Sequence, residues 1–227
     1  RPNPERARHL FRRIAPHLPM RPISVLDLGG GTGSLLTGFV ERGDRCYTVD
    51  YVAQTIPGVE RLASVLEELP ADRRFDLVIC SHVLEHVVEP LELLTRLVER
   101  LEPDGLAYVE VPMELLGGAP RLREPVTHIN FFTPGATELM CARAGLERLS
   151  GEVTPLLEVM RSYDTSFHAL GRRSSVAQAS APAEGLARQT ERALRPSVAA
   201  GVRRLANVGG EALRRLKGAL VRASPTS

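Results

Sequence analysis

Val-Leu-Asp-Leu-Gly-Gly-Gly-Thr-Gly, residues 25–33, is the stretch that decides the fold of this chain. Apolar residues run directly into a cluster of glycines, and one aspartate, Asp27, is set inside the run. This pattern predicts a buried parallel strand that ends in a turn whose backbone is not covered by side chains. A ligand can lie directly against the main chain of such a turn.

A second acid, Asp50, follows the strand-like residues 46–49. A glycine-rich turn after one strand and an acid at the tip of the next are typical of a nucleoside cofactor site in a Rossmann-like sheet. The turn lacks the G-x-G-x-x-G spacing, because the sixth position counted from Gly29 is Ser34. The sequence therefore disfavours a dinucleotide, whose pyrophosphate uses that spacing.

Helical and strand-like patterns alternate along the rest of the chain. Helices are expected over residues 4–18, 32–41, 90–101 and 134–144, and strands over residues 23–28, 45–49, 61–66, 75–80, 105–111, 146–153 and 166–170. This alternation predicts an α/β fold with a doubly wound, Rossmann-like, mostly parallel sheet of seven strands.

The composition predicts one globular domain with an appendage. Of the 227 residues, 43% are hydrophobic, and no stretch approaches the ~20 apolar residues of a membrane span. The charged start predicts no signal peptide. The three cysteines are widely spaced within apolar patterns, which indicates buried free thiols in a reducing compartment. We therefore expect a cytoplasmic protein.

Composition also divides the chain into a domain over residues 1–172, a linker over 173–185 and a basic amphipathic helical tail over 186–227. From residue 184 onward, nine basic residues stand against three acidic ones. For this tail we keep three alternatives: peripheral contact with an anionic membrane, pairing in a homodimer, or a solvated extension. Nucleic acid is not an expected partner, because the body is acidic and the tail lacks aromatic residues.

Two further motifs follow the glycine turn and Asp50. Residues 75–88 read Phe-Asp-Leu-Val-Ile-Cys-Ser-His-Val-Leu-Glu-His-Val-Val, and residues 101–106 read Leu-Glu-Pro-Asp-Gly-Leu. With these four motifs in this order, the chain resembles the class I S-adenosylmethionine-dependent methyltransferases, in particular the small-molecule group with a Leu-Glu-His motif after the fourth strand. The resemblance covers about residues 22–172. It implies a methyltransferase with S-adenosylmethionine as cofactor.

The resemblance also implies which positions hold the cofactor. Asp27 and the glycine backbone would surround its methionine part and ribose. Asp50 would accept hydrogen bonds from both ribose hydroxyls, because a carboxylate has two acceptor oxygens. The adenine would pack on Tyr51. The expected cofactor-binding residues are Asp27, Gly29, Gly31, Gly33, Asp50, Tyr51, Cys80 and Ser81.

Methyl transfer to oxygen or nitrogen requires an aligned acceptor and often a base that removes its proton. The first candidate for a base or an acceptor-binding residue is His128, in the stretch His-Ile-Asn-Phe-Phe-Thr-Pro. His86, in the Leu-Glu-His motif, either takes part in catalysis or only pins its loop. Glu110 is the third catalytic candidate. No metal site is expected, because no His or Glu pair combines metal-ligand spacing on a helix with a third partner.

The motifs do not identify the acceptor. We expect first a hydroxyl of a sugar, a glycan precursor or a natural product, with residues 117–124 as a loop over this small-molecule or saccharide acceptor. One alternative is a quinone or lipid-like acceptor at the membrane surface, with the amphipathic tail in contact with the membrane. A second alternative is a catalytically silent scaffold that retains the methyltransferase fold.

Overall fold

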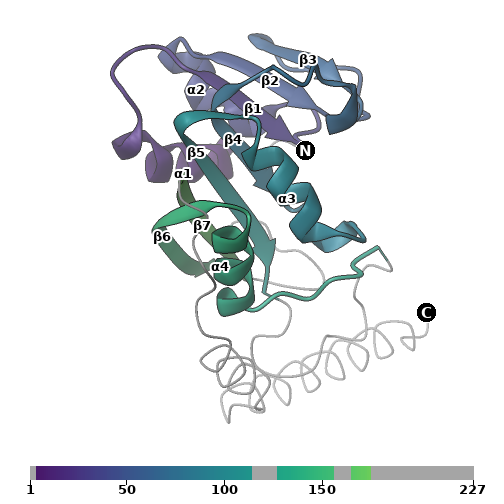
Figure 1. Ribbon diagram of the computed structural model, residues 1–227. Helices are drawn as coiled ribbons and strands as arrows, with labels where there is room; N and C mark the ends of the chain where they lie inside the picture. The colour runs from purple at the N-terminus through teal and green to yellow at the C-terminus, as the bar shows by residue number, and fades with distance from the viewer. Residues whose placement is uncertain (1–3, 114–126, 156–164, 175–227) are drawn as a thin grey trace, which may run out of the picture.

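The computed structural model describes residues 4–113, 127–155 and 165–174 (Figure 1). The loop expected over 117–124, most of the expected linker and the whole expected tail lie outside these residues. The described helices are α1 (Pro4–Ile14), α2 (Thr37–Arg42), α3 (Pro90–Val98) and α4 (Pro134–Arg143), with short 3₁₀ turns η1 (Ala15–His17), η2 (Ser34–Leu36), η3 (Leu66–Glu68) and η4 (Leu84–His86). The strands are β1 (Ser24–Leu28), β2 (Arg45–Val49), β3 (Val59–Ala63), β4 (Phe75–Ser81), β5 (Leu101–Pro112), β6 (Leu146–Pro155) and β7 (Thr165–Arg173).

The strands form one seven-stranded sheet in the order β3-β2-β1-β4-β5-β7-β6. The pairs from β3 to β5 are parallel, and β7 is antiparallel to both β5 and β6. This topology confirms the predicted α/β fold. The chain runs outward from β1 to β3 and then returns to β4 on the other side of β1. Open sheets of this kind bind ligands beyond the carboxyl ends of the strands at such a switch point.

Each face of the sheet has its own apolar core, because successive side chains of a strand point to opposite faces. On one face, Val25 of β1 and Ile79 of β4 pack with Leu10 of α1 and Phe39 of α2. On the other face, neighbouring strand residues such as Leu26 pack with residues of α3 and α4. Figure 1 shows the sheet between these two layers of helices. The next residue on the α1 face of β1 is Asp27, so the core leads directly to the predicted site.

The residues after the glycine turn depart from the expected helix over 32–41. They begin as the tight turn η2, in which the Leu36 N–H donates to the Gly33 carbonyl at 3.0 Å, and become α-helical only at Thr37. Gly38 lies against α1, where a Cβ atom would be 2.7 Å from the Phe11 ring. The helix is therefore shorter than predicted and packs closely on α1.

The third strand is Val59–Ala63 rather than residues 61–66. The apolar pattern continues to Leu66 because this side chain reaches the core from the turn η3 instead of from the strand. The link between β2 and β3 over residues 50–58 contains no helix.

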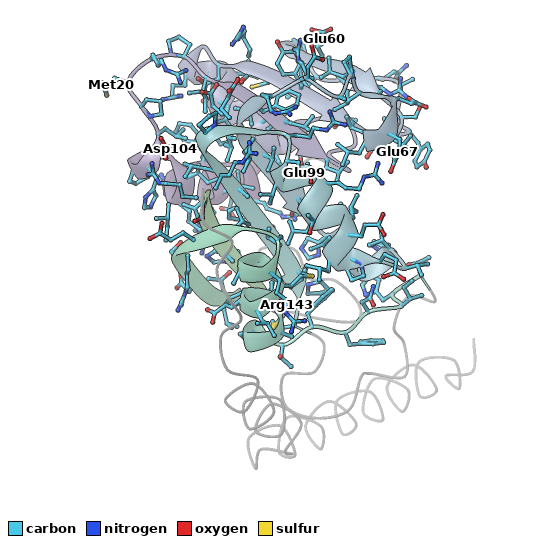
Figure 2. All side chains as sticks on the ribbon, viewed as in Figure 1. Met20, Glu60, Glu67, Glu99, Asp104 and Arg143 are labelled. Atoms are coloured by element: carbon cyan, nitrogen blue, oxygen red, sulfur yellow. The ribbon has the colours of Figure 1, made fainter. Side chains whose placement is uncertain are left out.

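Charged side chains cover much of the outer surface, and Glu60, Glu67 and Glu99 are among the exposed ones (Figure 2). The parts of the chain that the structure describes contain no helix with the length and apolar character needed to cross a membrane.

Candidate cofactor and acceptor site

The glycine turn after β1 has the backbone geometry that its sequence predicts. Gly29, Gly31 and Gly33 have φ angles of 71°, 55° and 76°, in the left-handed region that glycine adopts most readily. The Gly29 N–H donates to the Val49 carbonyl at 2.9 Å, which ties the turn to the end of β2. The turn therefore presents bare backbone at the carboxyl ends of β1 and β2.

Asp50 lies beside this turn, as expected. Its Oδ2 accepts a hydrogen bond from the Gly31 N–H at 2.8 Å, and its Oδ1 accepts one from the Val52 N–H at 2.8 Å. Each carboxylate oxygen can accept a second hydrogen bond, so the predicted contact with ribose hydroxyls stays available. The adjacent Tyr51 is 79% exposed, as an aromatic side chain would be at the open edge of a cofactor site.

Asp27 carries the least satisfied polar group in this region. Its side chain is 1% exposed, and neither carboxylate oxygen has a hydrogen-bond partner among the described residues. Burial raises the pKa of the carboxyl to about 7, while the charge of Arg6 lowers it and Asp50 raises it further. A buried carboxyl without a partner fits a ligand with a cationic group, such as the ammonium or sulfonium of S-adenosylmethionine.

Ser81 and Glu110 face each other at the ends of β4 and β5, where the register pairs them. The Ser81 hydroxyl donates to Glu110 Oε2 at 2.6 Å, and the Ser166 hydroxyl of β7 donates to Oε1 at 2.9 Å. From α1, the Arg6 guanidinium donates to the Ser81 hydroxyl at 2.6 Å and to Glu110 Oε2 at 3.1 Å. Helix α1 is thus fastened to the strand tips by a buried polar network.

Arg6 was not identified from the sequence. It precedes Leu10 by four positions, so it lies on the inward face of α1, and an arginine on an inward face indicates a buried acid to pair with. The position of Arg6 in the sequence therefore indicated a buried acidic partner, but it did not identify that partner as Glu110.

Glu110 is held as a carboxylate. Burial alone would raise its pKa, but the nearby His82, whose Nε2 lies 3.8 Å from Glu110 Oε1, the charge of Arg6 and the Ser81 hydrogen bond together lower the pKa well below its usual range. A carboxylate with a lowered pKa is a weak base. The geometry therefore favours a charge-balancing role for Glu110 over the abstraction of a proton.

Cys80 contributes differently from Ser81. Its side chain is fully buried in the α3 and α4 core, and burial raises the pKa of its thiol. The Cys80 side chain therefore packs in the core, and its place in the cofactor site stays a prediction.

The Leu-Glu-His segment follows β4 as the turn η4 and lies next to the glycine turn. A Cβ atom on Gly29 would be 2.5 Å from the Val83 side chain. His82 adopts a φ of 55°, and its Nδ1 is 3.1 Å from Glu85 Oε1. Burial lowers the pKa of His82, but the two carboxylates beside it, Glu110 and the hydrogen-bonded Glu85, outweigh this effect and raise it.

His86 and His128 come together although 41 residues separate them in the sequence. Their ring centroids are 4.7 Å apart at an interplanar angle of 72°. The Asn130 side chain donates to the carbonyls of Leu84 and Val87 at 3.0 and 2.6 Å, which fixes the segment of His128 against η4. The two histidine candidates therefore form one cluster, on the η4 side of the glycine turn.

Glu85 completes this cluster. Ligand atoms of Glu85, His86 and His128 all lie within 4.8 Å of one another, an arrangement that would accept a metal ion. The sequence predicted no metal site because His82 and His86 lacked a third partner on a helix. The cluster in the structure does not include His82; it brings Glu85 and His86 together with His128, which comes from a distant segment.

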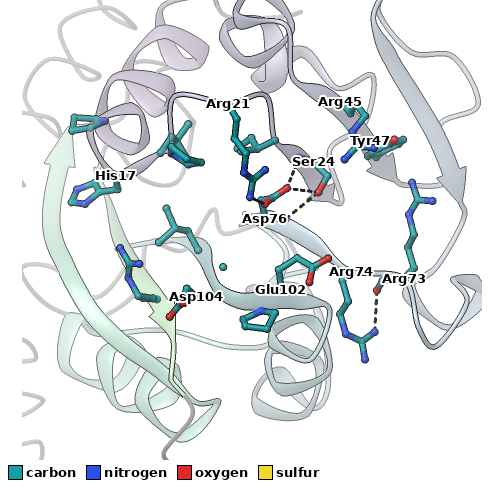
Figure 3. Close-up of a pocket in the computed structure, with 18 residues that line it drawn as sticks. His17, Arg21, Ser24, Arg45, Tyr47, Arg73, Arg74, Asp76, Glu102 and Asp104 are labelled. Carbon is teal, nitrogen blue, oxygen red and sulfur yellow. Dashed lines mark hydrogen bonds and ion pairs between the residues drawn. The ribbon is translucent and has the colours of Figure 1, made fainter.

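A hollow of about 960 Å³ lies at the opposite edge of the sheet. It is lined by the amino ends of the parallel strands, including Ser24 of β1, Arg45 of β2 and Asp76 of β4. Figure 3 shows Arg21 and Ser24 bound to Asp76 on its wall. None of the predicted site residues lines this hollow. Because ligands of doubly wound sheets bind at the carboxyl ends, we place the cofactor site at the glycine turn.

Comparison with known proteins identifies the family. A family model described as a methyltransferase domain matches residues 1–150. The ubiquinone biosynthesis O-methyltransferase of Rickettsia bellii is 31% identical over 119 residues, which cover 47% of this chain and 50% of the relative. That of Rickettsia felis is 29% identical over 119 residues, covering 47% and 49%. The chain spans about half the length of these curated relatives.

Solved structures share the fold. The 1,6-didemethyltoxoflavin-N1-methyltransferase of Burkholderia thailandensis, bound to 1,6-didemethyltoxoflavin and S-adenosylhomocysteine, has a TM-score of 0.58 at 22% identity, covering 75% of this chain and 77% of that one. The magnesium protoporphyrin IX methyltransferase of Synechocystis PCC 6803, with bound S-adenosylhomocysteine, has a TM-score of 0.56 at 16% identity, covering 75% and 83%. With the family model matched over most of the chain and the sheet in agreement, this chain belongs to the methyltransferase domain family.

Proposed function

We propose that this chain transfers a methyl group from S-adenosylmethionine to a ring hydroxyl of a quinone-type acceptor. The main observation in support of this cofactor is the buried carboxyl of Asp27 beneath the glycine turn. This carboxyl has no hydrogen-bond partner among the described residues. The cofactor is cationic at its sulfonium and at its amino group, so one of these groups would satisfy the carboxylate. Asp50 and Tyr51 are proposed to hold its nucleoside end.

The cluster of His86, His128 and Glu85 supports the acceptor side of the proposal. The cluster lies beside the glycine turn at the carboxyl end of β4, because Val83, just before Glu85 and His86 in the chain, lies against Gly29. A phenolic hydroxyl must lose its proton as its oxygen attacks the methyl carbon, and an imidazole nitrogen with a free lone pair can accept that proton. His128 and His86 therefore remain the proposed catalytic residues, and Glu110 is proposed to hold Ser81 and α1 in place.

The relatives favour a quinone-type acceptor over the sugar acceptor that the sequence placed first. The proteins named above act, by name, in ubiquinone biosynthesis, and their similarity to this chain reaches 31% over its matched part. None of the relatives named above acts, by name, on a sugar.

The proposal is tested in two steps. Calorimetric titration with S-adenosylmethionine is expected to give one site per chain. Transfer of radioactive methyl groups is then measured with a prenylated dihydroxybenzene and, in parallel, with a nucleotide sugar. Faster transfer to the aromatic acceptor supports the proposal. Cofactor binding with preferred transfer to the sugar would overturn the acceptor, and no cofactor binding at millimolar concentration would overturn the function.

Gly30→Ala is expected to weaken S-adenosylmethionine binding by about 10- to 100-fold, because overpacking of a tight site costs about 1–3 kcal/mol. The added Cβ would lie 2.5 Å from Asp27 Oδ2 and 2.9 Å from Asp27 Cβ, and this short buried side chain has little room to move. Calorimetry measures the loss. Gly43→Ala is the matched control, because its φ of 89° also makes alanine strained, while Gly43 lies away from the site with no atom within 4 Å of its added Cβ. Equal affinities of the two variants would contradict the close packing of Gly30 on Asp27.

A further inference from the structure

The cluster of Glu85, His86 and His128 has a donor set that recurs in metal sites. Two imidazoles and one carboxylate are the set used by many zinc and iron enzymes. Their ligand atoms lie within 4.8 Å of one another. Metal–ligand bonds of about 2.1 Å place tetrahedral ligands ~3.4 Å apart, so a small closure of the side chains would bring them to bonding distance.

The hydrogen bond of His86 leaves one nitrogen of its ring able to bind a metal ion. His86 Nδ1 is 3.0 Å from the Thr127 carbonyl oxygen, which can only accept, so Nδ1 carries the proton. In the neutral ring, Nε2 then has a free lone pair, and it lies 3.9 Å from Glu85 Oε1. Metal-binding histidines usually donate their other N–H to a carbonyl or carboxylate in this way.

Glu85 supplies a second and independent indication. Its side chain is 0% exposed, and Oε2 has no hydrogen-bond partner among the described residues. The other oxygen, Oε1, is hydrogen-bonded with His82 Nδ1 at 3.1 Å, which orients the carboxylate. A buried carboxylate oxygen without a partner is costly unless a cation or a donor occupies the space beside it.

We propose that Glu85, His86 and His128 bind one divalent transition-metal ion, such as Zn²⁺ or Co²⁺. Imidazole ligands favour these ions, whereas Mg²⁺ prefers a shell of oxygen ligands. Glu85 and His128 are buried, whereas the His86 side chain is 39% exposed, so the ion has an entry path and three protein ligands leave a position open. If the proposed function holds, an acceptor hydroxyl takes that open position, where the metal lowers its pKa and the proton passes to solvent, and His86 and His128 then act as metal ligands instead of as bases.

The test measures metal binding by itself, with neither S-adenosylmethionine nor an acceptor present, so its outcome is separate from that of the proposed function. The full chain is treated with chelator and reductant, dialysed, and titrated with Zn²⁺ by calorimetry and with Co²⁺ by visible absorption. We expect one ion per chain and Co²⁺ bands of nitrogen and oxygen coordination. Millimolar Mg²⁺ is expected not to displace the ion, and its displacement by Mg²⁺ would overturn the transition-metal assignment.

Three variants assign the ligands. His86→Ala and His128→Ala are each expected to weaken Zn²⁺ binding by at least about 100-fold, and Glu85→Gln by about 10- to 100-fold. His17→Ala is the matched control, because His17 is exposed in η1 at the opposite edge of the sheet. Circular dichroism confirms that the variants fold, and Glu85→Gln keeps the shape of the buried side chain. Absence of Zn²⁺ binding to the native chain, or equal affinity in all four variants, would overturn the site.

Discussion

Asp27→Asn is expected to stabilise the cofactor-free protein at pH 8 by on the order of 4 kcal/mol, while it weakens S-adenosylmethionine binding. The native carboxyl is buried without a hydrogen-bond partner among the described residues, and burial raises its pKa to about 7. Its ionised form is therefore forced into a site that favours the neutral form, and the shift from the ordinary value of 3.8 corresponds to about 1.4 kcal/mol for each pKa unit. Asparagine resembles the neutral acid at every pH.

The pH dependence of this effect has a defined sign. A group whose pKa is raised in the folded state contributes stability below its unfolded pKa and loses it as the pH rises through the folded pKa. The native protein and Asp27→Asn are therefore expected to be about equally stable near pH 4. The difference between their free energies of unfolding should increase between pH 4 and pH 7 and stay constant above pH 7. Urea denaturation across this range measures it.

Asp76→Asn is the matched control, and its effect should have the opposite sign. Asp76 is also an aspartate of the sheet, but Arg21 and Ser24 donate hydrogen bonds to it at 2.7 and 2.8 Å. Burial raises its pKa, but these bonds outweigh burial and lower the pKa overall. Asp76→Asn should therefore lose stability at pH 8. If Asp27→Asn also lost stability at pH 8, Asp27 would have to be stabilised as a carboxylate in the native protein.

The cofactor half of the site was predictable because it depends on short stretches of sequence. The strand and glycine turn at residues 25–33 fix their own backbone, and β2 must end beside them in a parallel sheet. Asp50 is therefore placed by topology alone. Residues 102–104 lie between the helix and the strand that the sequence predicts there, yet in the structure they belong to β5. Leu101 pairs with Phe75, and a register shift accommodates the extra residues.

The acceptor half depends on contacts between distant segments, which no local pattern specifies. His128 reaches His86 because Asn130 binds the carbonyls of Leu84 and Val87. Periodicity carries no information on which loop an asparagine will bind. For the same reason the sequence showed an arginine on the inward face of α1 but not its pairing with Glu110.

Glu110→Gln is expected to destabilise the protein by about 3–5 kcal/mol at pH 7, the cost of leaving buried cations without their counter-charge. Glu110 Oε2 binds Ser81 and Arg6 at 2.6 and 3.1 Å, and Oε1 lies 3.8 Å from His82 Nε2. The substitution keeps the shape of the side chain but removes the charge that Arg6 and His82 share. At about 2–4 °C for each kcal/mol, the melting temperature should fall on the order of 10 °C.

Acid titration separates this electrostatic role from simple packing. The pKa of Glu110 is lower in the folded protein than in the unfolded chain. Its charge therefore adds to the free energy of unfolding at pH values above the pKa of an ordinary glutamate. This contribution is lost as the pH falls through the folded-state pKa. Because Glu110 also raises the pKa of His82, the stability difference between the native protein and Glu110→Gln should grow as the pH falls from 7 to 5 and shrink only at lower pH, where Glu110 itself is protonated. Glu152→Gln is the matched control, because Glu152 has a 65% exposed side chain with ion-pair distances of 4.0 Å to Arg13 and 3.8 Å to His168. It should change stability by less than about 1 kcal/mol. A loss in Glu110→Gln that persisted undiminished at low pH would mean that the shape of Glu110, and not its charge, fastens α1 over the site.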